Sequence, residues 1–210
     1  MSKLRFEISI SADGFVAGPN QSEEHPLGEG GEQLHAWVVK LDAWRGAHGH
    51  SGGEANASSA IVAEAMVNVG AVIMGRNMFG GGPGPWDPEW HGWWGEDPPY
   101  HAPVFVLAHR PRESVEMQGG TVFHFVTEGI EPALALAREA AGERDVSIAG
   151  GPGTTNQYLA AGLIDELRLH VTPVVVGRGE RLFAGVGHTR LRLLSSRCTP
   201  EVNHLTYGKA

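Results

Sequence analysis

The residues with the clearest potential for chemistry form a glycine turn at positions 150–153. The turn follows an apolar run, Val146–Ala149, which predicts a strand, and it precedes a helical pattern that begins at Thr154. The first turn of a helix offers unpaired N–H groups and a partial positive charge, and glycine lets an anion approach the backbone closely. A tight turn without a ligand explains the same pattern equally well. The predicted phosphate-binding residues are Gly150, Gly151, Pro152, Gly153, Thr154 and Thr155.

Basic residues follow two other apolar runs. Gly75-Arg76-Asn77 comes after Met74, and His109-Arg110 comes after Ala108. An arginine side chain can form two parallel hydrogen bonds to a phosphate, although a surface ion pair is an equally good explanation for Arg76. Two basic sites beside one glycine turn suit a dinucleotide that carries an additional 2′-phosphate. The turn lacks the spacing of a Rossmann fingerprint, and no Lys-Ser or Lys-Thr pair follows it as in a P-loop.

The elements that must position these residues alternate between strands and helices. Strands are predicted at 4–11, 71–74, 104–108, 121–127, 146–149 and 163–173, with two more over 191–208 joined near Thr199-Pro200. Helices are predicted at 32–41, from Ser58 or Ser59 to 68, at 131–141 and at 154–161. This alternation predicts a single α/β domain over residues 1–210, with a mostly parallel sheet and an antiparallel C-terminal edge. Ligands bind beyond the carboxyl ends of such strands. The interruptions at 13–14, 75–76, 109–110 and 150–151 all follow strand ends, which predicts one cleft.

Irregular segments separate some of these elements. A polar loop is predicted at 19–31, an exposed loop at 42–57 and a long irregular segment at 80–102. The last segment contains Trp86, Trp90, Trp93 and Trp94, which could stack on a flat heterocycle, although packing is the more common role of tryptophan. Asp13 and Asp87 are weak catalytic candidates, and a turn-stabilising role is favoured for Asp13.

Composition narrows the class of protein. The formal net charge of −8 argues against nucleic acid or an anionic membrane as a partner. A single cysteine, Cys198, and an N-terminus without a signal-peptide pattern predict a cytoplasmic protein. The eleven histidines form no familiar metal-binding motif, so no metal is predicted.

Five motifs in order resemble the dihydrofolate reductase superfamily. They are Ser9–Gly18, Met74–Arg76, Gly150–Gly153, Gly162–Leu167 and Val171–Phe183. The last contains Pro-x-x-x-Gly-x-Gly-x-x-Leu-Phe, a pattern of the branch formed by the C-terminal reductase domain of bacterial riboflavin-biosynthesis deaminase/reductases. The resemblance covers nearly the whole chain. It implies a dihydrofolate reductase-like three-layer α/β/α fold, NADPH as the cofactor and a homodimer.

The resemblance also implies positions for the cofactor. The residues that would border the nicotinamide are Ser9, Val16 and Ala17. Those on the adenosine-side phosphates would be Gly75, Arg76 and Asn77, with Arg76 on the 2′-phosphate. Ala108, His109 and Arg110 would surround the adenosine, while Gly151, Pro152, Gly153, Thr154 and Thr155 would bind the pyrophosphate. The Gly150–Gly151 peptide bond is expected to be cis, and a trans bond would count against the assignment.

Departures from the family pattern restrict the substrate. Gln33 stands near the position where true dihydrofolate reductases carry a pterin-binding carboxylate, which makes folate a poor candidate. The zinc-deaminase motifs are missing from the sequence. The expected substrate-binding residues are Gln33, Trp37, Trp86 and Trp93.

The predicted reaction is hydride transfer from NADPH to a C=N or C=O group of a small heterocyclic or ribosyl substrate, with water as a possible proton source. The leading named substrate, by resemblance alone, is that of a 5-amino-6-(5-phosphoribosylamino)uracil reductase. The competing hypotheses are a non-catalytic NADP-binding regulatory or vestigial protein and a flavin-dependent reductase.

Overall fold

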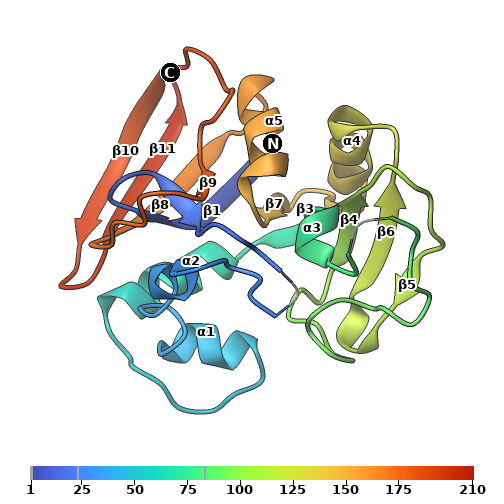
Figure 1. Cartoon of the computed structure of the whole chain (residues 1–210), viewed down its shortest axis with the longest axis horizontal. Coiled ribbons are helices and arrows are strands. Elements are labelled where there is room, and N and C mark those ends of the chain that lie inside the picture. The colour runs from blue at the N-terminus through green and yellow to red at the C-terminus, as the bar shows by residue number, and fades with distance from the viewer. Residues whose placement is uncertain (1, 23, 83) are drawn as a thin grey trace.

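The computed structural model describes residues 2–22, 24–82 and 84–210, and within these ranges the chain forms a nine-stranded mixed sheet with helices on both faces (Figure 1). The strands lie in the spatial order β10 (Leu191–Cys198), β11 (Asn203–Lys209), β8 (Glu166–Thr172), β1 (Leu4–Ser11), β7 (Asp145–Ala149), β3 (Val69–Gly75), β4 (Pro103–Leu107), β6 (Val122–Val126) and β5 (Val115–Glu116). The strands from β8 to β6 run parallel. The predicted antiparallel C-terminal edge is confirmed, because β11 pairs antiparallel with both β8 and β10.

The opposite edge of the sheet was not predicted. There the short strand β5 pairs antiparallel with β6. A two-residue strand carries too little alternation to be recognised in a sequence.

Helices cover both faces of the sheet, which confirms the three-layer architecture (Figure 1). One face packs against α4 (Ile130–Ala141) and α5 (Pro152–Ala160). The other face is covered by α1 (Asp42–Ala47), α2 (Ala57–Met66) and α3 (Arg76–Phe79), together with the 3-10 turn η1 (Gly31–Leu34). Outside the main sheet, β2 (Phe15–Ala17) pairs with β9 (Glu180–Arg181), and a second 3-10 turn, η2, spans Gln118–Gly120.

The alternation of β1 separates two chemically different faces. Leu4, Phe6 and Ile10 are almost fully buried in the core beneath α4 and α5. Arg5 and Glu7 alternate with them and therefore point to the face that α2 covers. Burial of the apolar side stabilises this strand at the centre of the sheet, by about 25 cal/mol for each Å² of apolar surface removed from water.

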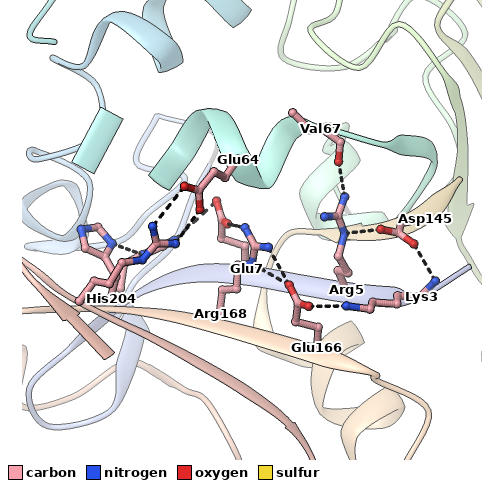
Figure 2. Close-up of polar contacts among 11 residues, drawn as sticks. Lys3, Arg5, Glu7, Glu64, Val67, Asp145, Glu166, Arg168 and His204 are labelled. Atoms are coloured by element: carbon pink, nitrogen blue, oxygen red, sulfur yellow. Dashed lines mark hydrogen bonds and ion pairs between the residues drawn. The ribbon is translucent and has the colours of Figure 1, made fainter. Parts of the chain in front are cut away.

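A layer of charged side chains lies on the α2 face of the sheet (Figure 2). Arg5 lies 3.3 Å from a carboxylate oxygen of Asp145 and donates a 2.8 Å hydrogen bond to the carbonyl oxygen of Val67, just after α2. Glu166 accepts hydrogen bonds from both Lys3 and Arg168. Loss of one partner from such a pair leaves a partly buried charge, which is costly. These pairs therefore tie neighbouring strands together, and the bond from Arg5 to Val67 ties the end of α2 to β1.

Several element boundaries differ from the predictions. The helix predicted at 32–41 is reduced to η1 followed by turns, and the loop predicted at 42–57 contains α1. Helix α2 starts at Ala57, earlier than the predicted start at Ser58 or Ser59, because Asn56 caps it by accepting a hydrogen bond from the N–H of Ser59. Helix α5 likewise starts at Pro152, whose fixed φ suits the first helical position. The loops predicted at 19–31 and 80–102 each include a position, 23 or 83, outside the described residues.

Across the described ranges, the helices are too short or too polar to cross a membrane.

Candidate functional site

The carboxyl ends of four adjacent parallel strands meet along one edge of the sheet. In spatial order these strands are β1, β7, β3 and β4. The segments that follow them contain the four sequence interruptions that were singled out as one cleft. The predicted convergence of these segments is therefore confirmed.

The turns after β3 and β7 touch each other. A Cβ atom on Gly75 would collide with the hydroxyl oxygen of Thr154, so only glycine fits there without displacing its neighbour. Gly150 also lies close to Met78, because a Cβ atom there would come within 2.9 Å of that side chain. The two motifs that were predicted to bind phosphates thus form one continuous surface.

The start of α5 is open to solvent at Gly151 and Gly153, whereas Pro152 and Thr155 are buried. The hydroxyl group of Thr155 donates to the carbonyl oxygen of Gly151 at 3.3 Å. An open groove of about 520 Å³ runs along one side of α5, from Pro152 and Gly153 to Ala160, with the segment 179–185 as its other wall.

The prediction of a cis Gly150–Gly151 bond is wrong, since the described residues contain no cis peptide bond. Gly150 instead adopts a φ of +118°, and this left-handed conformation reverses the chain direction with a trans bond. In this respect the chain departs from the pattern that the resemblance implied.

Arg76 does not extend into solvent. Its Nη2 atom donates to the carbonyl oxygens of Gly81 and Gly82 at 3.2 and 2.7 Å, and its guanidinium lies 3.2 Å from the ring centroid of Trp86. Burial lowers the pKa of Arg76, and the nearby charge of Arg112 lowers it further. A second guanidinium therefore stands beside the one that the sequence predicted.

Arg112 is the site residue that the sequence reasoning missed. Its guanidinium lies 5.2 Å from the Trp86 ring and donates to the carbonyl oxygen of Trp90 at 2.7 Å. The Nη1 atom of Arg112 is buried and has no partner among the described residues. Arg112 follows His109 and Arg110 by only a few positions, so the basic run itself was the available signal.

Most of the residues predicted around the adenosine are more exposed than Arg76 and Arg112. His109 and Arg110 are exposed, Ala108 is half-buried, and Asn77 is exposed at the second position of α3. The backbone carbonyl oxygen of Arg110 accepts a 3.0 Å hydrogen bond from the indole nitrogen of Trp86.

The tryptophans differ in their accessibility. Trp86 packs edge-to-face against Phe125, with ring centroids 4.8 Å apart, while Trp93 is 38% exposed. Trp37 is buried: its indole N–H donates to the hydroxyl oxygen of Ser9 at 3.0 Å, and its ring lies 5.0 Å from that of His170. Trp37 therefore supports the sheet face beneath Ser9 rather than facing solvent. Of the remaining candidates, Asp87 and Gln33 are exposed.

Val16 and Ala17, the other residues predicted beside the nicotinamide, are buried in β2. The segment before them is fixed by Asp13, which accepts a 2.6 Å hydrogen bond from the hydroxyl group of Ser11 and two from the backbone N–H groups of Val176 and Gly177. The bond from Ser11, helped by the two backbone bonds, lowers the pKa of Asp13 to about 2. Asp13 is therefore ionised near neutral pH, and it acts as a hydrogen-bond acceptor rather than as a proton donor.

In the ranges that the structure covers, no three His, Cys, Asp or Glu side chains gather into a possible metal site.

Comparison with known proteins adds the family context. The family model described as the RibD C-terminal domain matches residues 2–205. No curated protein matches the chain in sequence.

Similar solved structures include a candidate riboflavin biosynthesis protein of Shewanella sp. PV-4, which is 22% identical and has a TM-score of 0.63 over 100% of this chain and 99% of that one. Acinetobacter baumannii RibD is 16% identical, with a TM-score of 0.58. The diaminohydroxyphosphoribosylaminopyrimidine deaminase/5-amino-6-(5-phosphoribosylamino)uracil reductase of Thermotoga maritima is 10% identical, with a TM-score of 0.56. All of this chain aligns in both cases, but it spans only 58% and 57% of those two proteins. At these identities the likeness establishes the fold.

The contact between the two turns can be tested with a double-mutant cycle. We expect Gly75→Ala to lower the free energy of unfolding by about 1–3 kcal/mol, because the new methyl group would overlap Thr154. In a Thr154→Ala background, which removes the colliding hydroxyl group, most of this loss should disappear. Urea denaturation measures all four proteins. Gly153→Ala is the matched control, because no atom lies within 4 Å of its added methyl group, and additive effects in the cycle would contradict the contact.

The ionised state of Asp13 predicts a pH dependence of stability. Its folded pKa of about 2 is below its ordinary value of 3.8, so the stabilisation is fully present above about pH 4 and is lost as the pH falls toward 2. The stability difference between the wild-type protein and Asp13→Asn should therefore shrink across this window. Urea titrations at several pH values measure it, and a constant difference would be inconsistent with the hydrogen-bonded carboxylate.

Proposed function

The chain belongs to the RibD C-terminal domain family, and we propose that it is an NADPH-dependent reductase that transfers a hydride to a C=N or C=O group of a small heterocyclic or ribosyl substrate. The observation that carries this proposal is the contact of the two turns after β3 and β7, at Gly75 and Thr154. This contact places the open start of α5 beside the beginning of α3, on the edge of the sheet where ligands of α/β folds bind.

The residues at this edge fit a dinucleotide that carries an extra phosphate. Arg76 and Arg112 lie close enough for one charge to lower the pKa of the other side chain. Neither forms an ion pair with a carboxylate in the part of the chain that the structure describes. The unpartnered Nη1 atom of Arg112 is a donor without an acceptor. A phosphate monoester would offer both cations the missing negative charge.

Each region of the site has a separate task. Bound NADPH would supply the hydride; the protein binds and orients it and limits the access of water. The exposed N–H groups at Gly151 and Gly153 would hold the pyrophosphate, while Arg76 and Arg112 would hold the 2′-phosphate. Ser9, Val16 and Ala17 would border the nicotinamide. Because Asp13 is ionised, we propose water as the source of the proton.

The substrate class follows from the family. The Thermotoga maritima relative is named as a 5-amino-6-(5-phosphoribosylamino)uracil reductase, and we propose a related substrate for this chain. Gln33 and Trp93 have exposed side chains and remain the substrate-binding candidates, while Trp37 and Trp86 contribute support from beneath.

Cofactor preference tests this proposal. We expect NADPH to bind more tightly than NADH, and both Arg76→Ala and Arg112→Ala to raise the Kd for NADPH by roughly 10- to 100-fold, the value of a lost charge-assisted contact. The Kd for NADH should change little. Isothermal titration calorimetry measures both ligands. Arg144→Ala is the matched control, because Arg144 lies just before the amino end of β7, away from the site.

Other outcomes would favour other functions. If the wild-type protein binds neither NADPH nor NADH, the proposal is overturned. Tight NADPH binding without oxidation, across pterins, flavins and pyrimidine intermediates, would favour a non-catalytic NADP-binding protein. A yellow purified protein would indicate a bound flavin.

We also propose that the protein is a cytoplasmic homodimer. Strand β10 is an edge strand with one unpaired side, and Leu193 and Leu194 on it are 56% and 48% exposed. Pairing of two such edges would cover these side chains and the free backbone groups. Light scattering should give the mass of a dimer, and Leu193→Lys together with Leu194→Lys should shift it to a monomer; a dimer in this variant would exclude the β10 edge.

A further inference from the structure

We propose that Asp13 is a positioning residue for the nicotinamide, because its carboxylate fastens the segment 12–17 to the segment 174–182. This inference rests on the proposed function, which places Val16 and Ala17 beside the nicotinamide. The Asp13 carboxylate makes no hydrogen bond to the residues proposed to hold the cofactor phosphates. Asp13 would therefore govern one end of the cofactor and leave the other end unaffected.

The carboxylate joins two parts of the chain through three hydrogen bonds. Its Oδ1 atom accepts from the hydroxyl group of Ser11 at 2.6 Å and from the N–H of Val176 at 3.1 Å. Its Oδ2 atom accepts from the N–H of Gly177 at 2.8 Å. Both oxygens thus receive donors, and two of the three donors come from the distant segment.

Backbone hydrogen bonds continue the same junction on both sides of Asp13. The N–H of Ala12 donates to the carbonyl oxygen of Val174 at 2.8 Å, and the N–H of Leu182 donates to that of Gly14 at 3.2 Å. Strands β2 and β9 then pair directly, with Phe15 opposite Arg181. The guanidinium of Arg181 lies 4.3 Å from the centroid of the Phe15 ring.

Beyond these bonds, the first half of the segment 174–182 has two further contacts: Gly179 lies against the backbone of Ala17 and Gly18, and the exposed Arg178 pairs with Glu29 at 3.5 Å. The side chain of Val175 is 74% exposed, and Gly177 through Glu180 are exposed as well. Buried apolar contacts therefore contribute little there, and hydrogen bonds determine the position of the backbone. Asp13 supplies the only side-chain acceptor for the N–H groups of Val176 and Gly177 among the described residues.

Loss of the carboxylate should affect the two ends of the cofactor differently. Loss of the Asp13 bonds would loosen 174–179, and with it Gly179, which lies directly against the backbone of Ala17 and Gly18. The end of β9 would stay in place, because Leu182 is buried in the core and Asn156 bonds to the Arg181 carbonyl oxygen and the Phe183 N–H. The turns at Gly75 and Gly150 are fixed by their own close packing, so the phosphate side would keep its shape. Asp13 therefore acts through β2 and has no role as a proton donor.

The test compares two ligands that share the phosphate side. NADPH carries the nicotinamide, and adenosine 2′,5′-bisphosphate lacks it. We expect Asp13→Asn to raise the Kd for NADPH by about tenfold, the order of magnitude for a lost charged hydrogen bond, and to leave the Kd for the bisphosphate unchanged. Ser11→Ala removes one donor to Asp13 together with the acceptor of the Phe15 N–H in β2, so it should give the same pattern.

Asp165→Asn is the matched control. The Asp165 carboxylate also accepts a backbone N–H, that of Leu4, and pairs with Lys209, but it precedes β8 and lies at the amino end of the sheet. This variant should lose stability without a change in either Kd. Hydrogen exchange provides a second readout, in which Asp13→Asn alone should speed exchange across 174–179.

The outcomes separate the inference from the proposed function. Equal effects of Asp13→Asn on both ligands, or no effect on NADPH, would overturn the positioning role. Failure of the wild-type protein to bind either ligand would overturn the proposed function instead. Hydrogen exchange would then decide the fastening by itself, since unchanged protection of 174–179 in Asp13→Asn refutes it.

Discussion

The arrangement of this molecule depends on the close approach of two neighbouring strand-to-helix turns. Gly75 lies directly against Thr154 because β3 and β7 are adjacent and parallel. A side chain at position 75 would collide with the hydroxyl oxygen of Thr154, so either that side chain or the start of α5 would have to move. The contact therefore keeps the start of α5 close to the beginning of α3. The anion-binding surface that we propose at this edge would result from packing as much as from charge.

The two sides of the candidate site are held in place by different forces. On the phosphate side, glycines and buried strands set the geometry through close packing. On the other side, the segments around β2 and β9 are joined by hydrogen bonds to Asp13 and to backbone groups. The charged layer on the α2 face follows the second pattern, with Arg5 and Asp145 as an example. Packing gives the first side rigidity, and polar contacts leave the second side more responsive to solvent conditions.

The sequence predicted best those features that depend on local patterns. Strand β1 was predicted with its observed bounds, because its alternation of apolar and polar residues is strict. Helix α1 was missed because Gly46 and the glycines that follow it hide its short pattern. The roles of Arg112 and Asp13 depend on partners elsewhere in the chain, such as Trp86 and Gly177, which no local pattern reveals. The cis bond was wrongly predicted from resemblance, since a positive φ at Gly150 makes the turn with a trans bond.

The stacking of Trp86 on Arg76 has a practical consequence. An indole ring against a guanidinium, with its N–H hydrogen-bonded to a backbone carbonyl, has an emission that depends on both neighbours. Any ligand that draws Arg76 toward itself must alter that emission. Tryptophan emission also overlaps the absorption of a reduced nicotinamide, so energy transfer from the indole to such a ligand is possible. The protein therefore carries an intrinsic fluorescent reporter at its proposed ligand site, and it needs no added dye.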